Sequence, residues 1–546
     1  MWPLLLACAA YRLWYLTRPQ AILDGDEAMT GLMVRRILAG HPYAFLADQH
    51  YNGAIEQYPQ ALVWAVLPQT PFTLRLPEVG LAVLACWLVF RVGREMLGDR
   101  RAWLAAALFA VGPFFLIWKG VRSHGAYPTA QILGLLGIWA ALRLRAGPTA
   151  DPATNPGARR TGWLAAAFGL VAGAAGWSAW TAGYLLVPAA VWLAPQLRRR
   201  PGLVAPVLAG ALVGYLPALA WALRHHELPL LLGSQPGTGP LDRLRLLFGP
   251  VLREFLGVGY FGAAPGWPAA LQTLAVLGLA GAYLVACWRR RHGLAALVLL
   301  RADGARRPAD LTLLVPPVVV LFYVLSKFAW WAGEPRYLFA AYPALALGLA
   351  ALPPGRPPHD GRPPDHAPHR PPPGRRPHGR PIGRLAGPLV ATALLLAVGG
   401  SSLVTVIRHG GDGDAGRDDC LLAAGGWLAR HGITAAYSDY WTGMPLQLLA
   451  GDRYGLSVAP MNSGRAKFPA LRYAADAAPP AYVVSRALDP MGQAEDQVAA
   501  MDRELAGHGV AATRTQVACV TVYTDLRPAL RPWELGMGRT LPPGRR

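Results

Sequence analysis

Apolar stretches close to the length of a membrane span recur along most of the 546-residue chain. A helix needs about 20 mainly apolar residues to cross a bilayer, and several of these stretches, at about 15 to 17 residues, fall at the short limit. The composition agrees, because 53% of the residues are hydrophobic and 15% are charged. We therefore predict an α-helical polytopic membrane protein with about eleven spans, near residues 3–17, 77–97, 102–118, 126–142, 161–176, 182–196, 203–223, 268–287, 310–326, 337–352 and 386–406.

The formal net charge is +21, but the arginines lie in short clusters between apolar stretches and not along one stripe, so we expect no nucleic-acid partner. Clusters such as Arg100–Arg101 and Arg198–Arg200 fall in every second connection, and loops rich in basic residues stay in the cytoplasm. This predicts a multi-pass protein of the cytoplasmic (plasma) membrane with a cytoplasmic N-terminus and an extracytoplasmic C-terminal part. The first apolar stretch lacks a basic leader and a clean cleavage site, so we expect it to be the first span.

The spans divide the chain into a transmembrane domain, residues 1–406, and a C-terminal region, residues 407–546. Residues 18–76 form a long outer loop, and residues 353–384 are predicted to be a disordered cytoplasmic linker, because a segment rich in Pro, Arg, Gly and His cannot bury a core. The C-terminal region contains four strand-like segments, "ITAAYSD", "YGLSVAP", "AYVVS" and "ACVTVYTD". They alternate with three helix-like segments that end in glycine, "CLLAAGGWLARHG", "MPLQLLAG" and "QAEDQVAAMDRELAGHG", which predicts a small extracytoplasmic α/β domain. A disulfide between Cys420 and Cys519 in this region is a hypothesis that spacing alone does not establish.

Three carboxylates, Asp24, Asp26 and Glu27, are crowded directly behind the first predicted span. Asp24 suits the N-cap of a helix, with Glu27 three residues on as in a capping box, and the helix dipole favours acidic residues there. The apolar residues that follow predict an amphipathic helix in the membrane interface. Capping explains Asp24 and Glu27 but leaves Asp26 unexplained, and a carboxylate near lipid is often functional.

"DGD" also matches the DxD pattern with which soluble nucleotide-sugar transferases hold a metal ion. That pattern belongs at the end of a strand in a nucleotide-binding fold, whereas here it follows a membrane span. Asp24 and Asp26, together with Glu27, still offer oxygen ligands to a divalent cation such as Mg or Mn, so a metal cofactor is left open.

The residues around Asp26-Glu27 resemble those of the polytopic GT-C glycosyltransferases, in particular the protein O-mannosyltransferases and the aminoarabinose transferases of lipid A. Those proteins carry an Asp-Glu pair behind their first span, and "LRLPEVGLAVLACWLVFRVGREMLG" and "GEPRYLFAAYPALALGLA" also look like the family. The resemblance implies a GT-C-like fold and inverting transfer of a sugar from a polyprenyl-phosphate donor to a lipid, glycan or protein acceptor at the outer face. Asp26, paired with Glu27, would be the catalytic base.

The leaving polyprenyl phosphate needs cations, and outward arginines near the membrane are suited to its oxygens. Arg336 in "GEPRY" and Arg122 in "KGVRSHGAYP" are the first candidates, followed by Lys119 and His124; each also suits an interfacial anchor. The sequence departs from the family in two places. The stretch "YNGAIEQYPQALVW" has no lysine where aminoarabinose transferases carry a phosphate-contacting one, and "RSHGAYP" lacks an acidic residue that relatives often have. The donor sugar is therefore not carried over.

Two other classes of function stay open: a polytopic transporter or lipid flippase, and a non-catalytic envelope assembly factor. A transporter should carry ionisable residues in the middle of its spans, whereas here they cluster at the outer ends of loops. In the tail, Asp439, Tyr440 and Trp441 of "YSDYWTGMPL" suit either a carbohydrate-binding face or packing within the small domain.

Overall fold

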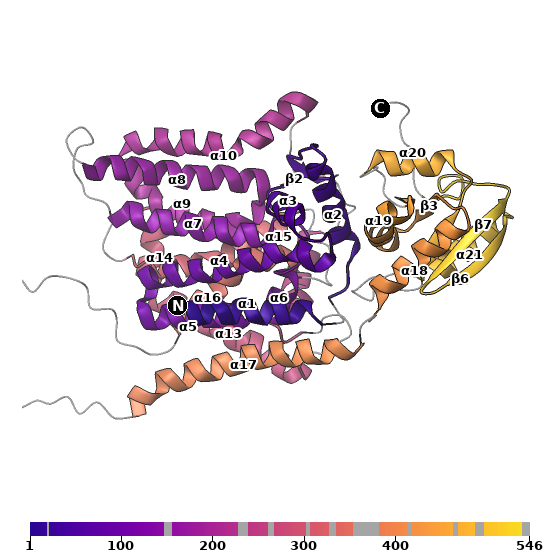
Figure 1. Ribbon diagram of the computed structural model, residues 1–546. Helices are drawn as coiled ribbons and strands as arrows, with labels where there is room; N and C mark the ends of the chain where they lie inside the picture. Colours follow the sequence, from indigo (N-terminus) through magenta and orange to yellow (C-terminus); the bar gives the residue numbers. More distant parts are fainter. Residues whose placement is uncertain are drawn as a thin grey trace, which may run out of the picture.

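The computed structural model describes residues 1–18, 21–47, 49–146, 156–227, 239–259, 267–301, 306–326, 335–352, 382–412, 416–461, 468–485 and 496–537. A bundle of helices forms the larger part of the molecule, and a small domain with a β-sheet lies against one end of it (Figure 1). Most of the predicted linker at 353–384, up to residue 381, lies outside the described residues.

The helices of the first half of the bundle are α1 (Trp2–Leu16), α4 (Pro71–Leu97), α5 (Asp99–Val111), α6 (Phe114–Lys119), α7 (Tyr127–Ala146), α8 (Pro156–Ser178), α9 (Gly183–Arg199) and α10 (Val204–His225). The second half comprises α11 (Pro240–Leu246), the π-helical turn η3 (Leu247–Val251), α12 (Leu252–Phe255), α13 (Ala269–Arg289), α14 (Arg291–Val298), α15 (Asp310–Leu325), α16 (Tyr342–Ala351) and α17 (Ile382–Asp412). Three short 3-10 turns connect or extend these helices: η1 (Trp180–Ala182), η2 (Pro201–Leu203) and η4 (Arg336–Ala341).

Every predicted apolar stretch lies in a helical part of the structure, although not every one is a single long helix. The stretch predicted at 102–118 is broken at Gly112–Pro113 into α5 and α6: the backbone of Gly112 leaves the helical conformation, and Pro113, which has no N–H to donate, is the N-cap of α6. Among the described residues, three helices are long and apolar enough to cross a membrane: Pro71–Leu97, Pro201–His225 and Ala269–Arg289. The fold is thus mainly helical as predicted, and the count of about eleven spans stays a prediction.

The first predicted outer loop folds into α2 (Gly25–Leu38), the short antiparallel strands β1 (Phe45–Leu46) and β2 (Gln49–Gly53), and α3 (Gln57–Val66). The predicted amphipathic helix is α2. Its apolar face does not lie open toward a membrane, however, because Met29 and Met33 are buried in a cluster with Trp64 of α3. Leu448 of the C-terminal domain belongs to the same cluster.

The C-terminal domain contains α18 (Arg417–Arg430), β3 (Ala435–Ser438), α19 (Tyr440–Tyr454), β4 (Ser457–Pro460), α20 (Pro469–Ala477), β5 (Tyr482–Ser485), α21 (Gln497–Gly507), β6 (Ala511–Val517) and β7 (Val520–Arg527). Its strands are ordered β4-β3-β5-β7-β6; β3 runs parallel to β4 and β5, and β7 is antiparallel to β5 and β6. The structure joins Cys420 of α18 to Cys519 beside β7 in a disulfide, with the Cα atoms 5.9 Å apart.

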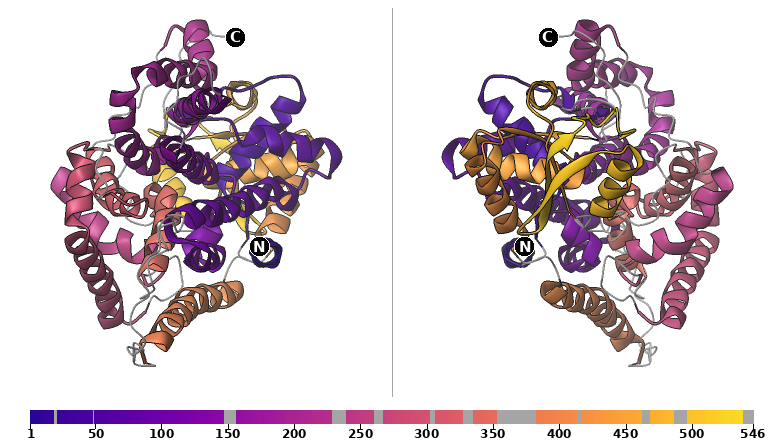
Figure 2. Two further views of the ribbon diagram at one scale, coloured as in Figure 1. Left: turned by 90° about the vertical axis from the view of Figure 1, so that its left-hand side faces the viewer. Right: turned by 90° about the vertical axis from the view of Figure 1, so that its right-hand side faces the viewer.

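The C-terminal domain sits at the end of the bundle where α2 and α3 lie, so that α2 is placed between the bundle and α19 (Figure 1). The right-hand view of Figure 2 looks at the end of the bundle that carries this domain and shows the yellow strands of its sheet in front of the helices. The segment that carries Asp24, Asp26 and Glu27 therefore contacts both parts of the chain.

Candidate functional site

Asp24 is the N-cap of α2, as the sequence predicts. Its Oδ1 accepts a hydrogen bond from the backbone N–H of Glu27 at 2.9 Å, which satisfies one of the free donors of the first helical turn. The capping interaction uses only one carboxylate oxygen. The other, Oδ2, accepts from Arg122 at 2.9 Å and from Nε2 of His124 at 2.5 Å.

Glu27 is fully buried, and its side chain does not complete a capping box. Both oxygens face the guanidinium of Arg75 in α4, at 2.7 Å from Nε and 2.5 Å from a terminal nitrogen, so the pair is bidentate. Arg75 also donates to the backbone carbonyls of Ala21 and Ile22, at 2.6 and 2.8 Å. This arginine thus fixes the chain that leads into α2 as well as the first turn of the helix.

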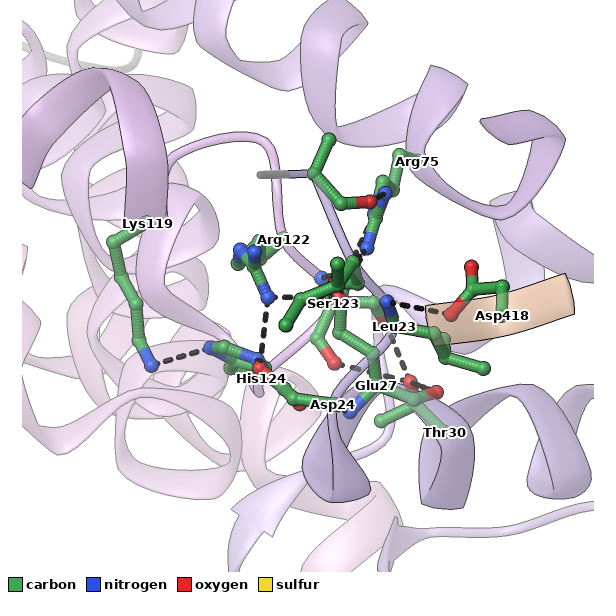
Figure 3. Close-up of polar contacts among 12 residues, drawn as sticks. Leu23, Asp24, Glu27, Thr30, Arg75, Lys119, Arg122, Ser123, His124 and Asp418 are labelled. Atoms are coloured by element: carbon green, nitrogen blue, oxygen red, sulfur yellow. Dashed lines mark hydrogen bonds and ion pairs between the residues drawn. The ribbon is translucent and has the colours of Figure 1, made fainter. Parts of the chain in front are cut away.

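Arg122 joins the two carboxylates, because the same nitrogen lies 2.9 Å from Asp24 and 3.2 Å from Glu27 (Figure 3). The next residue, Ser123, donates its backbone N–H to Glu27 at 3.4 Å, and its hydroxyl bonds Thr30 of α2 at 2.8 Å. The loop between α6 and α7 is in this way attached to the first two turns of α2.

Lys119, at the end of α6, is only 1% exposed and contacts Nδ1 of His124. An ammonium group can only donate, so Nδ1 of His124 accepts and its Nε2–H donates to Asp24. Arg75, Arg122 and Lys119 thus bring three basic side chains to the carboxylates of Asp24 and Glu27.

The ion pairs also set the protonation of the two carboxylates. Burial by itself would raise the pKa of Asp24, but His124 and Arg122 outweigh it and hold the pKa well below the usual value. Burial likewise opposes ionisation of Glu27, yet Arg75 and Arg122 lower its pKa. Both groups are therefore ionised, and both are held by cations on at least one oxygen.

Asp26 differs from its two neighbours. It is half-buried, and the structure does not place it among the buried cations. Its Oδ1 accepts a hydrogen bond at 2.9 Å from the hydroxyl of Tyr440, the first residue of α19 in the C-terminal domain. The structure therefore brings together five of the predicted site residues, Asp24, Glu27, Lys119, Arg122 and His124, and places Asp26 beside them on the side of the C-terminal domain.

Arg336, the first candidate for the donor phosphate, begins η4 and is half-buried. The turn that it opens packs Phe339 against Tyr127 with ring centroids 5.8 Å apart, and the ammonium of Lys119 lies 5.3 Å from the same Tyr127 ring. The structure thus places η4 next to α6, the helix that ends in Lys119.

Among the described residues, a possible metal-binding group combines Asp24 with Glu27 and His124 rather than with Asp26. Ligand atoms of Asp24, Glu27 and His124 lie within 4.8 Å of one another, which is the spacing of a metal site. In the present arrangement, however, Oδ2 of Asp24 faces Arg122 and His124, and both oxygens of Glu27 face Arg75. A divalent cation would have to displace two guanidinium groups, so these residues as arranged do not fit a metal, and we derive no step through one.

A second polar network lies behind the first and was not recognised as a site from the sequence. Gln60 of α3 donates to Glu78 of α4 at 2.7 Å and to the hydroxyl of Ser123 at 2.7 Å. Glu56, which precedes α3, accepts at 2.7 Å from the hydroxyl of Thr129. Burial raises the pKa of Glu56 to about 8, so this group is protonated near neutral pH.

Two further contributors, Arg75 and Tyr440, belong to stretches quoted from the sequence, but their partners were not predicted. Arg75 lies in the arginine-proline entry to α4, and the clue was a lone arginine at the start of an apolar helix. Tyr440 lies 414 positions from Asp26, and no local signal connects them. Asp418 of α18 makes another contact that was not predicted: it accepts a hydrogen bond at 3.4 Å from the backbone N–H of Leu23 (Figure 3).

No family model matches the sequence, and no curated protein matches it at a significant level. The structure does align with known ones. It matches apo ArnT from Cupriavidus metallidurans, an aminoarabinose transferase, over 96% of this chain and 97% of that chain, with a TM-score of 0.58 and 14% sequence identity. The chain has the GT-C fold.

The same ArnT bound to undecaprenyl phosphate aligns over 95% of this chain and 97% of that chain, with a TM-score of 0.54 and 15% identity. A looser likeness, with a TM-score of 0.46 and 14% identity over 82% of this chain and 61% of the other, is to an oligosaccharyltransferase from Archaeoglobus fulgidus in complex with Zn and sulfate. The alignment with ArnT spans the bundle and the C-terminal domain together, so the GT-C fold accounts for the whole chain.

Proposed function

We propose that this protein is a membrane glycosyltransferase that transfers a sugar from a polyprenyl-phosphate donor to a hydroxyl-bearing acceptor at the outer face of the membrane. The observation that carries the proposal is the placement of a half-buried carboxylate, Asp26, beside a buried group that contains three basic side chains, Arg75, Arg122 and Lys119. The fold shared with ArnT, one structure of which contains undecaprenyl phosphate, supports a lipid phosphate as the carrier.

The chemistry follows from these charges. Asp26 accepts the proton of the acceptor hydroxyl while the acceptor oxygen forms a bond to the anomeric carbon of the donor sugar. On the opposite face of the sugar, the bond between the anomeric carbon and the phosphate oxygen breaks, which inverts the configuration. The electron pair of that bond leaves with the polyprenyl phosphate, whose charge is stabilised by the cations.

The cations divide into two groups. Arg75 and Arg122 are bound by the carboxylates of Asp24 and Glu27, so their role is to hold the loop that presents Asp26. Lys119 contacts the ring of His124, and Arg336 begins the turn η4, whose Phe339 packs on the same Tyr127 ring as Lys119. These two cations are proposed to contact the phosphate. Asp24 and Glu27 are ionised but surrounded by donors, which makes them poor bases.

The direct test is transfer by the purified protein in detergent or nanodiscs. Polyprenyl phosphates that carry different radiolabelled sugars are offered with membrane lipid or glycan acceptors, and the product is separated from the donor. We expect transfer from at least one donor. Movement of a labelled lipid across liposomes containing the protein, without any sugar transfer, would favour a flippase instead.

The proposed orientation has its own test. His41, in the turn after α2, and Arg100, at the start of α5, are both exposed, so a cysteine at either position can react with a maleimide. In intact cells, a membrane-impermeant maleimide should label His41→Cys, and it should label Arg100→Cys only after permeabilisation. The reverse pattern would invert the orientation.

A further inference from the structure

The C-terminal domain contacts the proposed base through one side chain. The hydroxyl of Tyr440 donates to Oδ1 of Asp26 at 2.9 Å, and it also lies 3.8 Å from the sulfur of Met29, one turn further along α2. A hydrogen bond to an ionised carboxylate is stronger than one between neutral groups. The hydrogen bond from Tyr440 occupies Oδ1 of Asp26 and thereby sets the direction in which Oδ2 points.

Tyr440 is itself held firmly. It follows Asp439, the N-cap of α19, whose Oδ1 accepts from the backbone N–H groups of Trp441 and Thr442 at 3.0 and 2.9 Å. The Tyr440 ring packs edge-on against Trp441, with centroids 5.2 Å apart. These contacts explain Asp439 and Tyr440 without a carbohydrate-binding face, and they place the phenol at the end of β3.

Two glycines on α2, Gly25 and Gly31, lie directly beneath side chains of α19. A Cβ added at Gly25 would lie 3.0 Å from the Tyr440 ring, and one added at Gly31 would lie 2.7 Å from the side chain of Leu448. Glycine at both positions lets α19 pack closely on the helix that carries Asp26. The contact is therefore a built interface between two parts of the chain and not a chance meeting of surface side chains.

We infer that Tyr440 is a positioning residue for the reaction: it holds Oδ1 of Asp26 so that Oδ2 is directed to the acceptor hydroxyl, and the C-terminal domain thereby completes the site. This inference rests on the proposed function, because it assigns a role to the partner of the proposed base. A base that is oriented by a third group is a recurrent arrangement in enzymes that activate a hydroxyl. Here the third group comes from the opposite end of the sequence.

The test is Tyr440→Phe, which keeps the ring and its packing and removes the hydroxyl. We expect kcat to fall by about ten- to a hundredfold, as for the loss of one hydrogen bond to a charged group, with KM for the lipid-linked donor unchanged. The matched control is Asp452→Asn on the same helix. It breaks the ion pair of Asp452 with Arg35 of α2, at 3.0 Å, but does not touch Asp26, so kcat should stay near that of the wild type.

A double-mutant cycle separates positioning from packing. If Tyr440 acts through Asp26, Tyr440→Phe should cause no further loss in an Asp26→Asn background, because the group that it orients is already gone. Independent, multiplicative losses would assign Tyr440 a structural role and overturn the inference. So would wild-type kcat in Tyr440→Phe, or an equal loss in the Asp452→Asn control.

These outcomes are distinct from a failure of the proposed function. If the wild type transfers sugar and Tyr440→Phe does so equally well, only the role of Tyr440 is wrong. If the wild type transfers no sugar from any lipid-linked donor, the proposed function is wrong and the positioning role fails with it.

Discussion

Three carboxylates within the first turn of α2 have different surroundings. Asp24 and Glu27 are buried and meet guanidinium groups at 2.5 to 3.2 Å, whereas Asp26 is half-buried and meets a phenol. The α-helix explains the difference, since successive side chains point about 100° apart and residue 26 faces away from the bundle that residues 24 and 27 address. Neighbours in the sequence thus have different surroundings: two carboxylates are bound by cations and hold the loop, and the third, Asp26, is the proposed base.

The largest expected effect on stability is that of Glu27→Gln. Removing this charge leaves Arg75 and Arg122 buried with less compensation, so we expect the free energy of unfolding to fall by about 3 to 5 kcal/mol. Thermal unfolding in detergent measures the change. The matched control is Glu95→Gln, which breaks a partly exposed pair with Arg143 and should lower stability by about 1 kcal/mol or less. Equal effects of the two variants would show that Glu27 does not have the structural role described here.

The pH dependence of stability tests whether Glu56 is protonated in the folded protein. Burial raises the pKa of Glu56 from 4.5 to about 8. Between these two pH values the folded protein keeps the Glu56 proton, whereas the unfolded chain has released it. Stability should therefore fall as the pH rises through this window, by up to about 1.4 kcal/mol per pH unit, and level off above the folded pKa. Glu56→Gln should make the fall of the melting temperature between about pH 5 and pH 8 less steep.

The control for this experiment is Glu504→Gln, because the Glu504 side chain is 45% exposed on the C-terminal domain. It should leave the pH profile as in the wild type. Parallel profiles for the wild type and Glu56→Gln would contradict the protonated state assigned to Glu56.

The smallest expected effect belongs to the exposed ion pair between the two parts of the chain. The side chain of Asp452 is 75% exposed, so Asp452→Asn should lower the free energy of unfolding by less than about 1 kcal/mol. The difference should shrink further at high salt, because screening weakens exposed pairs first. A loss of several kcal/mol would mean that this pair, and not the packing of α19 on Gly25 and Gly31, holds the domains together.

Local features of the fold could be predicted from the sequence, because they depend on neighbouring residues. The cap at Asp24, the helix that follows it and the strands β3, β4, β5 and β7 are all found at their predicted segments. Strand β6 and helix α20 were missed. Strand β6 lies at the edge of the sheet and is mostly exposed, so its sequence "AATRTQV" lacks the apolar pattern of a buried strand.

The partners within the site could not be predicted, because they depend on how distant segments pack. Glu27 was assigned to a capping box, but its side chain turns to Arg75, which lies 48 residues away in α4. The metal pair Asp24 and Asp26 was suggested by spacing alone, yet the helical turn between them directs the two side chains to different neighbours. Charged residues near the ends of predicted spans were named as candidates from the sequence, and only the tertiary structure shows which of them meet.

The assignment of Asp26 as the base is tested by the turnover of Asp26→Asn, measured beside that of the wild type with a polyprenyl-phosphate sugar as donor. Loss of a general base should lower kcat by about a hundred- to ten-thousandfold. The melting temperature should stay near that of the wild type, because Asp26 is half-buried and has no cationic partner among the described contacts. Wild-type turnover in a folded Asp26→Asn protein would contradict the assignment of Asp26 as the base.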